Sequence, residues 1–269
     1  TFTLFISAVN DAPTDISLDN SSIPEGSPIN TLVGNLSSTD PDSTTFTYTF
    51  IDGANDNAYF TISGSQLKTN YASFDREVKS VYTVQIRSTD NGTPGLTFDK
   101  SLTITISDVN ETPTNIILSN NTIQEHNPAG TVIGDLSTTD PDSGQTFTYT
   151  LVTNPDDKFK IVGSQLQTNA ALEYEDNTSY AIRIRTTDNG APTNLSFEKD
   201  FTIIITDAND APTDISLSDN KVEEHPGSGV QIGILSTTDA DAGQAFTYEL
   251  VSGEGSDDNS SFAIVDNQL

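Results

Sequence analysis

The sequence contains no cysteine, methionine or tryptophan, and it has few basic residues. Without cysteine the chain forms no disulfide bond and has no thiol for catalysis or metal binding. No apolar run reaches the length that a membrane-spanning helix requires. Only 11 Lys and Arg stand against 39 Asp and Glu, which gives a formal net charge of −28 at pH 7. This charge argues against nucleic acid or an anionic membrane as the partner and favours cations, or serves simple solubility.

The sequence does contain a repeat about 100 residues long. Asn10, Asn110 and Asn209 recur at intervals of 100 and 99 residues, and the motifs STDPDS, TTDPDS and TTDADA keep the same spacing. An interval of this size is the length of one small domain. The expected divisions are the last strand and linker of a preceding repeat at 1–13, repeat 1 at 14–112, repeat 2 at 113–211 and a truncated repeat 3 at 212–269.

The apolar residues within each repeat follow a period of two. Leu102, Ile104 and Ile106 alternate with hydroxyl residues, and FTYTF (46–50), FTYTL (147–151) and FTYEL (246–250) add aromatic versions of the same pattern. This alternation is typical of half-buried strands. In repeat 2 the expected strands lie near 115–119, 130–137, 146–152, 158–162, 164–168, 178–187 and 195–206. About seven strands per repeat predict an all-β fold of tandem Ig-like Greek-key β-sandwiches. Repeat 3 lacks counterparts of the last two strands, so we expect that it does not fold alone.

Acidic residues gather where the repeats meet. The linkers AVNDAPT, DVNETPT and DANDAPT share an Asn, an acid and a Pro. In an extended linker Asp108 and Asn110 project to one side and Glu111 to the other. The same i, i+2 spacing of acids recurs in FDRE, LEYE and DPD near expected strand ends. Pro113 then ends the pairing of the strand, because it has no N–H to donate.

These motifs resemble those of the cadherin repeat. IPEG (23–26), TDPD (39–42), FDRE (74–77), TDNG (89–92) and DVNETP (108–113) occur in that family's order, and the resemblance extends over the full chain. It implies calcium ions, typically three, at each junction between successive repeats. For junction 1, where repeats 1 and 2 meet, the implied ligands are Glu25, Asp75, Glu77, Asp108, Asn110, Glu111, Asp140, Asp142 and Asp188. For junction 2, where repeats 2 and 3 meet, they are Glu125, Glu173, Glu175, Asp207, Asn209, Asp210, Asp239 and Asp241.

Two departures from the family pattern affect the expected sites. The linkers are one residue shorter than the animal pattern, and in this they look like the bacterial cadherin-like tandem repeats of large surface adhesins. At the N-terminal linker Ala8 replaces the leading Asp. The ligands that remain at that linker are Asn10, Asp11, Asp40, Asp42 and Asp90. We therefore expect a weak or empty site there.

The chemistry of junction 1 agrees with calcium. Ca²⁺ takes about six to eight hard oxygen ligands, and junction 1 supplies eight carboxylates and one Asn. Two carboxylates about 4 Å apart repel by roughly 4 kcal/mol at an effective dielectric constant near 20. Without metal the junction is therefore expected to be flexible, and with calcium it is expected to be stiff.

These observations predict a non-enzymatic, extracellular or cell-surface segment of a larger protein. Calcium would rigidify a rod used in cell adhesion or as the stalk of an adhesin. His126 and His225 follow equivalent Glu residues and are interpreted as residues of exposed loops, since neither has a catalytic motif around it. The alternative is a carbohydrate-binding surface module with calcium in a purely structural role. Homophilic pairing, a protein receptor and a polysaccharide all remain open as adhesive contacts.

Overall fold

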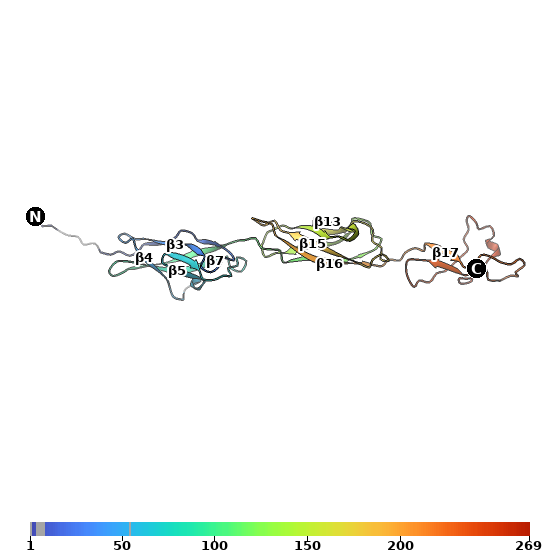
Figure 1. Cartoon of the computed structure of the whole chain (residues 1–269), viewed down its shortest axis with the longest axis horizontal. Helices are drawn as coiled ribbons and strands as arrows, with labels where there is room; N and C mark the ends of the chain where they lie inside the picture. The colour runs from blue at the N-terminus through green and yellow to red at the C-terminus, as the bar shows by residue number, and fades with distance from the viewer. Residues whose placement is uncertain (1, 4–8, 54) are drawn as a thin grey trace. The chain divides into compact units, whose positions relative to one another are not determined.

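Figure 1 shows the chain in a computed structural model, which describes residues 2–3, 9–53 and 55–269. The strand expected within residues 1–13 falls largely on residues 4–8, which lie outside these ranges. Two compact units form. The first extends to Thr114 and includes Asp140–Thr146 and Asp188–Ser196, and the remaining residues from Asn115 onward form the second.

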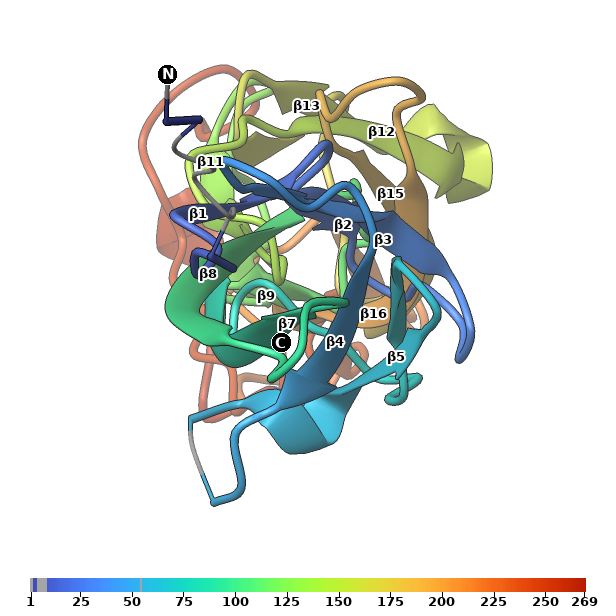
Figure 2. The same ribbon diagram turned by 90° about the vertical axis from the view of Figure 1, so that its left-hand side faces the viewer.

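The first unit contains two four-stranded sheets, which have the orders β1-β3-β6-β5 and β2-β8-β7-β4. Several of these strands are labelled in Figures 1 and 2. The strands are β1 (Asp15–Leu18), β2 (Ser22–Pro24), β3 (Leu32–Thr39), β4 (Phe46–Phe50), β5 (Phe60–Ser63), β6 (Gln66–Thr69), β7 (Val81–Asp90) and β8 (Thr97–Ser107), with a 3₁₀ turn η1 (Asn57–Tyr59) before β5. The alternating pattern forms the core as expected, since Ile104 and Ile106 are buried and Thr103 and Thr105 are exposed.

The start of repeat 1 is divided between the two sheets. β1 pairs antiparallel with β3, whereas β2 pairs parallel with β8. In this register Pro24 lies opposite Ser107, and the N–H of Glu25 donates to the carbonyl of Ser107 over 3.0 Å. The pairing therefore holds Glu25 beside the beginning of the linker.

Repeat 2 has the same arrangement, with sheet orders β13-β14-β11-β9 and β10-β16-β15-β12. Its strands are β9 (Asn115–Leu118), β10 (Thr122–Gln124), β11 (Val132–Thr139), β12 (Thr148–Thr153), β13 (Phe159–Val162), β14 (Gln165–Thr168), β15 (Ser179–Thr187) and β16 (Ser196–Thr206), with η2 at Pro155–Asp157. The seven expected strands are present. The prediction missed β10, a strand of three residues that pairs parallel with β16. The structure is thus all-β, with tandem β-sandwich repeats.

The residues after Thr213 form β17 (Asp214–Leu217) and β18 (Leu235–Thr238), which pair with each other, and the turn η3 (Asn259–Ser261). The expectation of a strand at FTYEL was wrong, because residues 246–250 have no strand conformation. In repeats 1 and 2 the equivalent strands pair with β7 and β15, and the sequence contains no third copy of that partner. A strand without a partner leaves its backbone groups unpaired. None of the short helical turns in the described ranges has the length or apolar character of a membrane-spanning helix.

Candidate metal centres

Glu25 organises the repeat 1 side of junction 1. Its Oε2 accepts a hydrogen bond of 2.9 Å from the N–H of Arg76, and its Oε1 accepts one of 2.8 Å from the N–H of Val109. The carboxylate is therefore fixed between the FDRE turn and the linker. Oxygens of Glu25, Asp75 and Glu77 lie within 4.8 Å of one another.

A second acid group joins repeat 1, the linker and the first part of repeat 2. Oxygens of Glu77, Asp108 and Asp142 also lie within 4.8 Å of one another. The linker is attached to Asp142 directly, because the N–H of Glu111 donates to Asp142 Oδ2 over 2.7 Å. Arg76 places Nη1 3.3 Å from Asp108 and 3.4 Å from Glu77, so one cation already balances part of this charge.

Asp142 carries a buried oxygen to which none of the described residues donates a hydrogen bond. The residue is only 7% exposed, and its Oδ1 has no hydrogen-bond partner within the described part of the chain. Asp140 accepts from the N–H of Asp142 with Oδ1 over 3.0 Å, and its own Oδ2 is likewise buried without a partner among the described residues. A buried polar atom of this kind is costly unless another ligand satisfies it.

Asn110 attaches the linker to the TDNG turn of repeat 2. Its Nδ2 donates to Asp188 Oδ2 over 3.3 Å and to the carbonyl of Thr193 over 3.0 Å, while its Oδ1 accepts from Gln145 Nε2 over 2.7 Å. A Cβ atom at Gly190 would lie 1.5 Å from Asn110 Oδ1. The glycine is thus required by the close approach of the linker side chain.

Burial, together with repulsion among the acids, raises the pKa of three carboxyl groups at junction 1. Burial raises the pKa of Glu77, and the charges of Glu25 and Asp108 raise it further. Burial also raises the pKa of Glu111, again with Glu25 and Glu77 among the repelling charges. The pKa of Asp140 is raised by burial as well. Metal-free carboxylates at junction 1 therefore resist carrying their full charge.

Junction 2 repeats this construction in the second unit. Glu125 accepts hydrogen bonds from the N–H groups of Tyr174 and Ala208, and the bond from Tyr174 is the main reason that the pKa of Glu125 is lowered. The N–H of Asp210 donates to Asp241 Oδ2 over 2.6 Å. Donor atoms lie within 4.8 Å of one another in three groups, namely Glu125, Glu175 and Asp210; Glu175, Asp207 and Asp241; and Glu125, His126 and Glu173.

Other residues at junction 2 extend the similarity. Asp239 accepts from the N–H of Asp241 over 2.9 Å and keeps a buried Oδ2 without a partner within the described ranges. Burial raises the pKa of Asp207, with the charge of Asp241 as the next cause. Gln244 Nε2 donates to Asn209 Oδ1 over 3.0 Å, as Gln145 does to Asn110.

The N-terminal linker keeps the attachment but has fewer acids. Asn10 Nδ2 donates to Asp90 Oδ2 over 3.0 Å, the N–H of Asp11 donates to Asp42 Oδ2 over 3.1 Å, and that of Asp42 donates to Asp40 Oδ1 over 2.9 Å. These five residues belong to none of the close groups of metal-ligating side chains found in the described residues. That the site at this linker is weak or empty stays a prediction.

The structure thus brings most of the residues expected at the two junctions into close groups, and whether they bind a metal stays a prediction. Eleven expected residues lie in the close groups: Glu25, Asp75, Glu77, Asp108, Asp142, Glu125, Glu173, Glu175, Asp207, Asp210 and Asp241. The remaining six expected residues at the two junctions lie outside these groups but form the hydrogen bonds described above. They are Asn110, Glu111, Asp140, Asp188, Asn209 and Asp239, and the pKa of Glu111 is also raised.

The sequence did not identify four residues that contact the expected ligands at the two junctions. They are Arg76, Gln145, Gln244 and His126. A signal for the glutamines existed, because both follow DPDSG or DADAG at the same place in two repeats. No local signal pointed to Arg76 or to the neighbours of His126.

Comparison with protein families identifies the family to which the chain belongs. The model of the cadherin domain matches residues 19–107 and 119–206. The chain belongs to the cadherin domain family. It is 30% identical to mouse (Mus musculus) protocadherin Fat 4 over 258 residues, which are 91% of this chain and 5% of that protein. Human protocadherin gamma-C5 is 30% identical over 85% of this chain and 26% of its own length.

Solved cadherin structures have the same fold. The protocadherin gammaB4 extracellular domain superposes with a TM-score of 0.68 at 26% identity, covering 98% of this chain and 44% of that one. Mouse cadherin-23 EC22-24 gives a TM-score of 0.66 at 23% identity over 93% of this chain and 82% of that one, which supports the fold alone. These relatives are animal cadherins, so they give no support to the expected likeness to bacterial cadherin-like repeats.

Proposed function

We propose that this chain is an extracellular segment of a larger adhesion protein, in which calcium bound at the junctions makes successive cadherin repeats rigid. The observation that carries the proposal is the group formed by Glu77, Asp108 and Asp142, whose oxygens come within 4.8 Å of one another from three separate parts of the chain. Exposed acids gather without metal in many proteins, but this group includes an aspartate that is 7% exposed.

The donors at junction 1 fit calcium. They are carboxylate and amide oxygens, which are the ligands that Ca²⁺ prefers at about 2.3–2.6 Å. Asp142 Oδ1 and Asp140 Oδ2 are buried and lack partners in the described ranges, so a cation would satisfy both. Burial and neighbouring negative charges raise the pKa of Glu77, Glu111 and Asp140, which supports a cation at this place. Calcium would supply that charge and would be held by Glu25, Asp75, Glu77, Asp108, Asp140 and Asp142.

The linker would transmit calcium binding into rigidity. Glu25 fixes the N–H of Val109, and Asp142 fixes the N–H of Glu111. Both carboxylates are proposed ligands, so a bound cation would hold the groups that in turn hold the linker. Removing it leaves repelling charges on both sides of the linker. Binding to the folded form alone also stabilises that form.

The names of related structures support an extracellular, adhesive role. One related structure is described as the protocadherin gammaB4 extracellular domain, and another, 28% identical, as a protocadherin gammaB7 EC3-6 cis-dimer. We therefore propose contact with a second cadherin chain as the first partner to test. A role in catalysis is not proposed, because the paired acids recur at both junctions as a structural role requires.

The carbohydrate-binding alternative gains no support from the aromatic residues. Tyr48, Phe60, Tyr82, Phe159 and Tyr180 are all buried in the sandwich cores. A sugar platform needs exposed aromatic faces, so these side chains are unavailable for one.

The proposal is tested by calcium titration and small-angle scattering on the whole chain. Isothermal titration calorimetry should show calcium binding with dissociation constants of about 10⁻⁴–10⁻³ M or tighter. Addition of chelator should then broaden the distribution of interatomic distances in scattering. Absence of measurable calcium binding at millimolar calcium would refute the metal centres. Binding without any change in scattering would refute the rigidifying role.

A further inference from the structure

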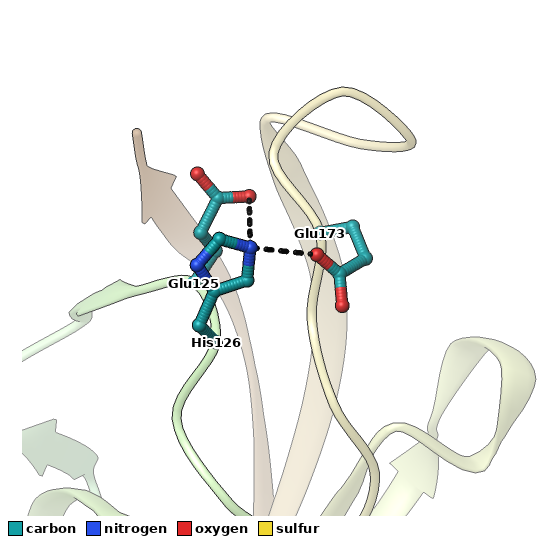
Figure 3. Close-up of side chains that lie close together, drawn as sticks. All are labelled: Glu125, His126 and Glu173. Carbon is teal, nitrogen blue, oxygen red and sulfur yellow. Dashed lines mark ion pairs between the residues drawn. The ribbon is translucent and has the colours of Figure 1, made fainter. Parts of the chain in front are cut away.

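Junction 2 contains an imidazole nitrogen among its carboxylates. His126 Nε2 lies 3.0 Å from Asp210 Oδ1, 3.2 Å from Glu173 Oε2 and 4.0 Å from Glu125 Oε2. Figure 3 shows the imidazole between the Glu125 and Glu173 carboxylates, with Nε2 directed at both. The three acids come from the turn after β10, the segment between β14 and β15, and the linker after β16. The imidazole therefore lies where three distant segments meet.

The donor set differs from that of a calcium site. Ca²⁺ binds almost only oxygen, whereas imidazole suits zinc and other divalent ions of the first transition series. Donor atoms about 2.0–2.1 Å from a tetrahedral ion lie about 3.3 Å from one another. The distances of 3.0 and 3.2 Å from Nε2 to the two carboxylate oxygens are close to that edge length. The donors of Glu125, His126 and Glu173 all lie within 4.8 Å of one another, so small side-chain rotations bring them to one ion.

The side chains of His126 and Glu173 are accessible to solvent, whereas Glu125 is held in place by hydrogen bonds. The side chains of His126 and Glu173 are 39% and 44% exposed, whereas that of Glu125 is fully buried. Backbone N–H groups of Tyr174 and Ala208 hold the Glu125 carboxylate in place. The site thus combines one fixed carboxylate with ligands that an ion reaches from solvent.

Repeat 1 provides an internal comparison. His126 has a left-handed backbone with φ of 59°, and the equivalent residue in repeat 1 is Gly26 with φ of 63°. The backbone N–H groups of these two residues donate to equivalent carbonyl groups, that of Gly26 to Phe74 and that of His126 to Leu172. A left-handed conformation disfavours most side chains, yet here it carries an imidazole. Junction 1 therefore has the same backbone without the nitrogen ligand.

We propose that His126, Glu125, Glu173 and Asp210 form a site for a borderline divalent cation such as Zn²⁺, which junction 1 does not share. The three acids are also proposed calcium ligands, so zinc and calcium would compete at this end of repeat 2. The zinc site follows from the imidazole geometry and does not depend on whether calcium binds.

The test uses the whole chain and two histidine variants. Zinc is titrated calorimetrically, and Co²⁺ is used as a spectroscopic probe, first without calcium and then at saturating calcium. His126→Gly reproduces the backbone and side chain of repeat 1, so the fold is expected to survive, and circular dichroism checks it. His225→Gly is the matched control, since His225 has the same left-handed backbone with φ of 57°.

We expect His126→Gly to weaken zinc binding at least about tenfold and to abolish the strong visible absorption that Co²⁺ shows in a tetrahedral site. His225→Gly should leave both unchanged, and calcium should weaken zinc binding to the wild-type chain. Equal zinc affinity in the wild type and His126→Gly would overturn the proposal, as would loss of the Co²⁺ signal in His225→Gly instead. If calcium fails to bind at all while zinc binding still requires His126, the calcium proposal fails and this one stands.

Discussion

The backbone N–H of Glu111 donates a 2.7 Å hydrogen bond to Asp142 Oδ2, while Oδ1 of the same carboxylate is buried without a partner in the described part of the chain. One oxygen thus fixes the linker and the other is available to a cation. The equivalent bonds from Asp11 to Asp42 and from Asp210 to Asp241 show that all three linkers are attached in this way.

Asp142→Asn should therefore weaken calcium binding at junction 1 at least about tenfold, because it removes the charge of a buried ligand at almost constant shape. Calorimetric titration of the whole chain measures the change. Asp52→Asn is the matched control, since Asp52 is exposed and belongs to none of the close acid groups of the described residues. Equal losses in both variants would mean that only the net charge matters.

Gly190→Ala should detach Asn110 from the TDNG turn. The new Cβ would lie 1.5 Å from Asn110 Oδ1, so the amide must move and lose its bonds to Asp188 and Thr193. Each lost bond costs about 1 kcal/mol. Chemical denaturation of Gly190→Ala, Asn110→Ala and the double variant measures the coupling.

The double variant should be little worse than either single variant, because both substitutions remove the same contact. Strictly additive losses would contradict the close approach as the reason for the glycine.

Asp15→Asn should remove an acid-sensitive contribution from repeat 1. Lys100 Nζ donates to Asp15 Oδ1 over 2.6 Å, and this bond is the main reason that the pKa of Asp15 is lowered from 3.8. A carboxylate with a lowered pKa stabilises the fold above its unfolded pKa, and this contribution is lost as the pH falls below 3.8 toward the folded pKa. NMR titration of the Asp15 carboxyl in the metal-free chain measures the shift directly.

Repeat 2 supplies the control for this pair. Lys199 Nζ donates to Asn115 Oδ1 over 2.9 Å, so the same lysine contact occurs there with a neutral acceptor. Asn115→Asp should create in repeat 2 the acid sensitivity that Asp15→Asn removes from repeat 1. An Asp15 carboxyl that titrates at 3.8 or above would show that the lysine contact is lost in solution.

The alternation of apolar and polar residues predicted the fold, because it indicates which face of each strand is buried. The alternation around Ile104 and Ile106 identified the buried face of β8, and the seven strands expected in repeat 2 are all present. Strand β10 was not predicted, because three residues are too few to show the alternation of a strand. Its partner β16 also lies about 80 residues later in the chain. The FTYEL segment shows the reverse error, since an apolar pattern forms a strand only when a neighbouring strand pairs with it.

The candidate metal centres were predicted less completely than the fold. A sequence shows which residues are charged, but it does not show which of them lie in contact after folding. The acids of FDRE, DPD and the linkers were found as motifs, and the structure brings most of them together. The role of Asn110 as a ligand stays a prediction, and nothing in the sequence indicated that both ends of its amide are hydrogen-bonded to residues at least 35 positions away. His126 was interpreted as an exposed loop residue, and its 39% exposure agrees with that interpretation. Its three carboxylate neighbours depend on the folding of distant segments.

Leu67→Ala and Leu166→Ala should show whether calcium couples the repeats. The two leucines occupy equivalent places in β6 and β14, and both are fully buried, one in each sandwich core. Each substitution should cost about 2–5 kcal/mol, because it removes buried apolar contacts and leaves a cavity. In chelator, differential scanning calorimetry should show each variant lowering the transition of its own repeat only.

In saturating calcium the result should differ. The proposed ligands at junction 1 include Glu77 from repeat 1 and Asp142 from repeat 2, so unfolding either repeat releases the ion. Loss of the ion removes a binding free energy from the repeat that is still folded. Leu67→Ala should then also lower the transition of repeat 2, and Leu166→Ala that of repeat 1. Two transitions that stay independent in calcium would separate metal binding from coupling between the repeats, and the rigidifying role would have to be abandoned.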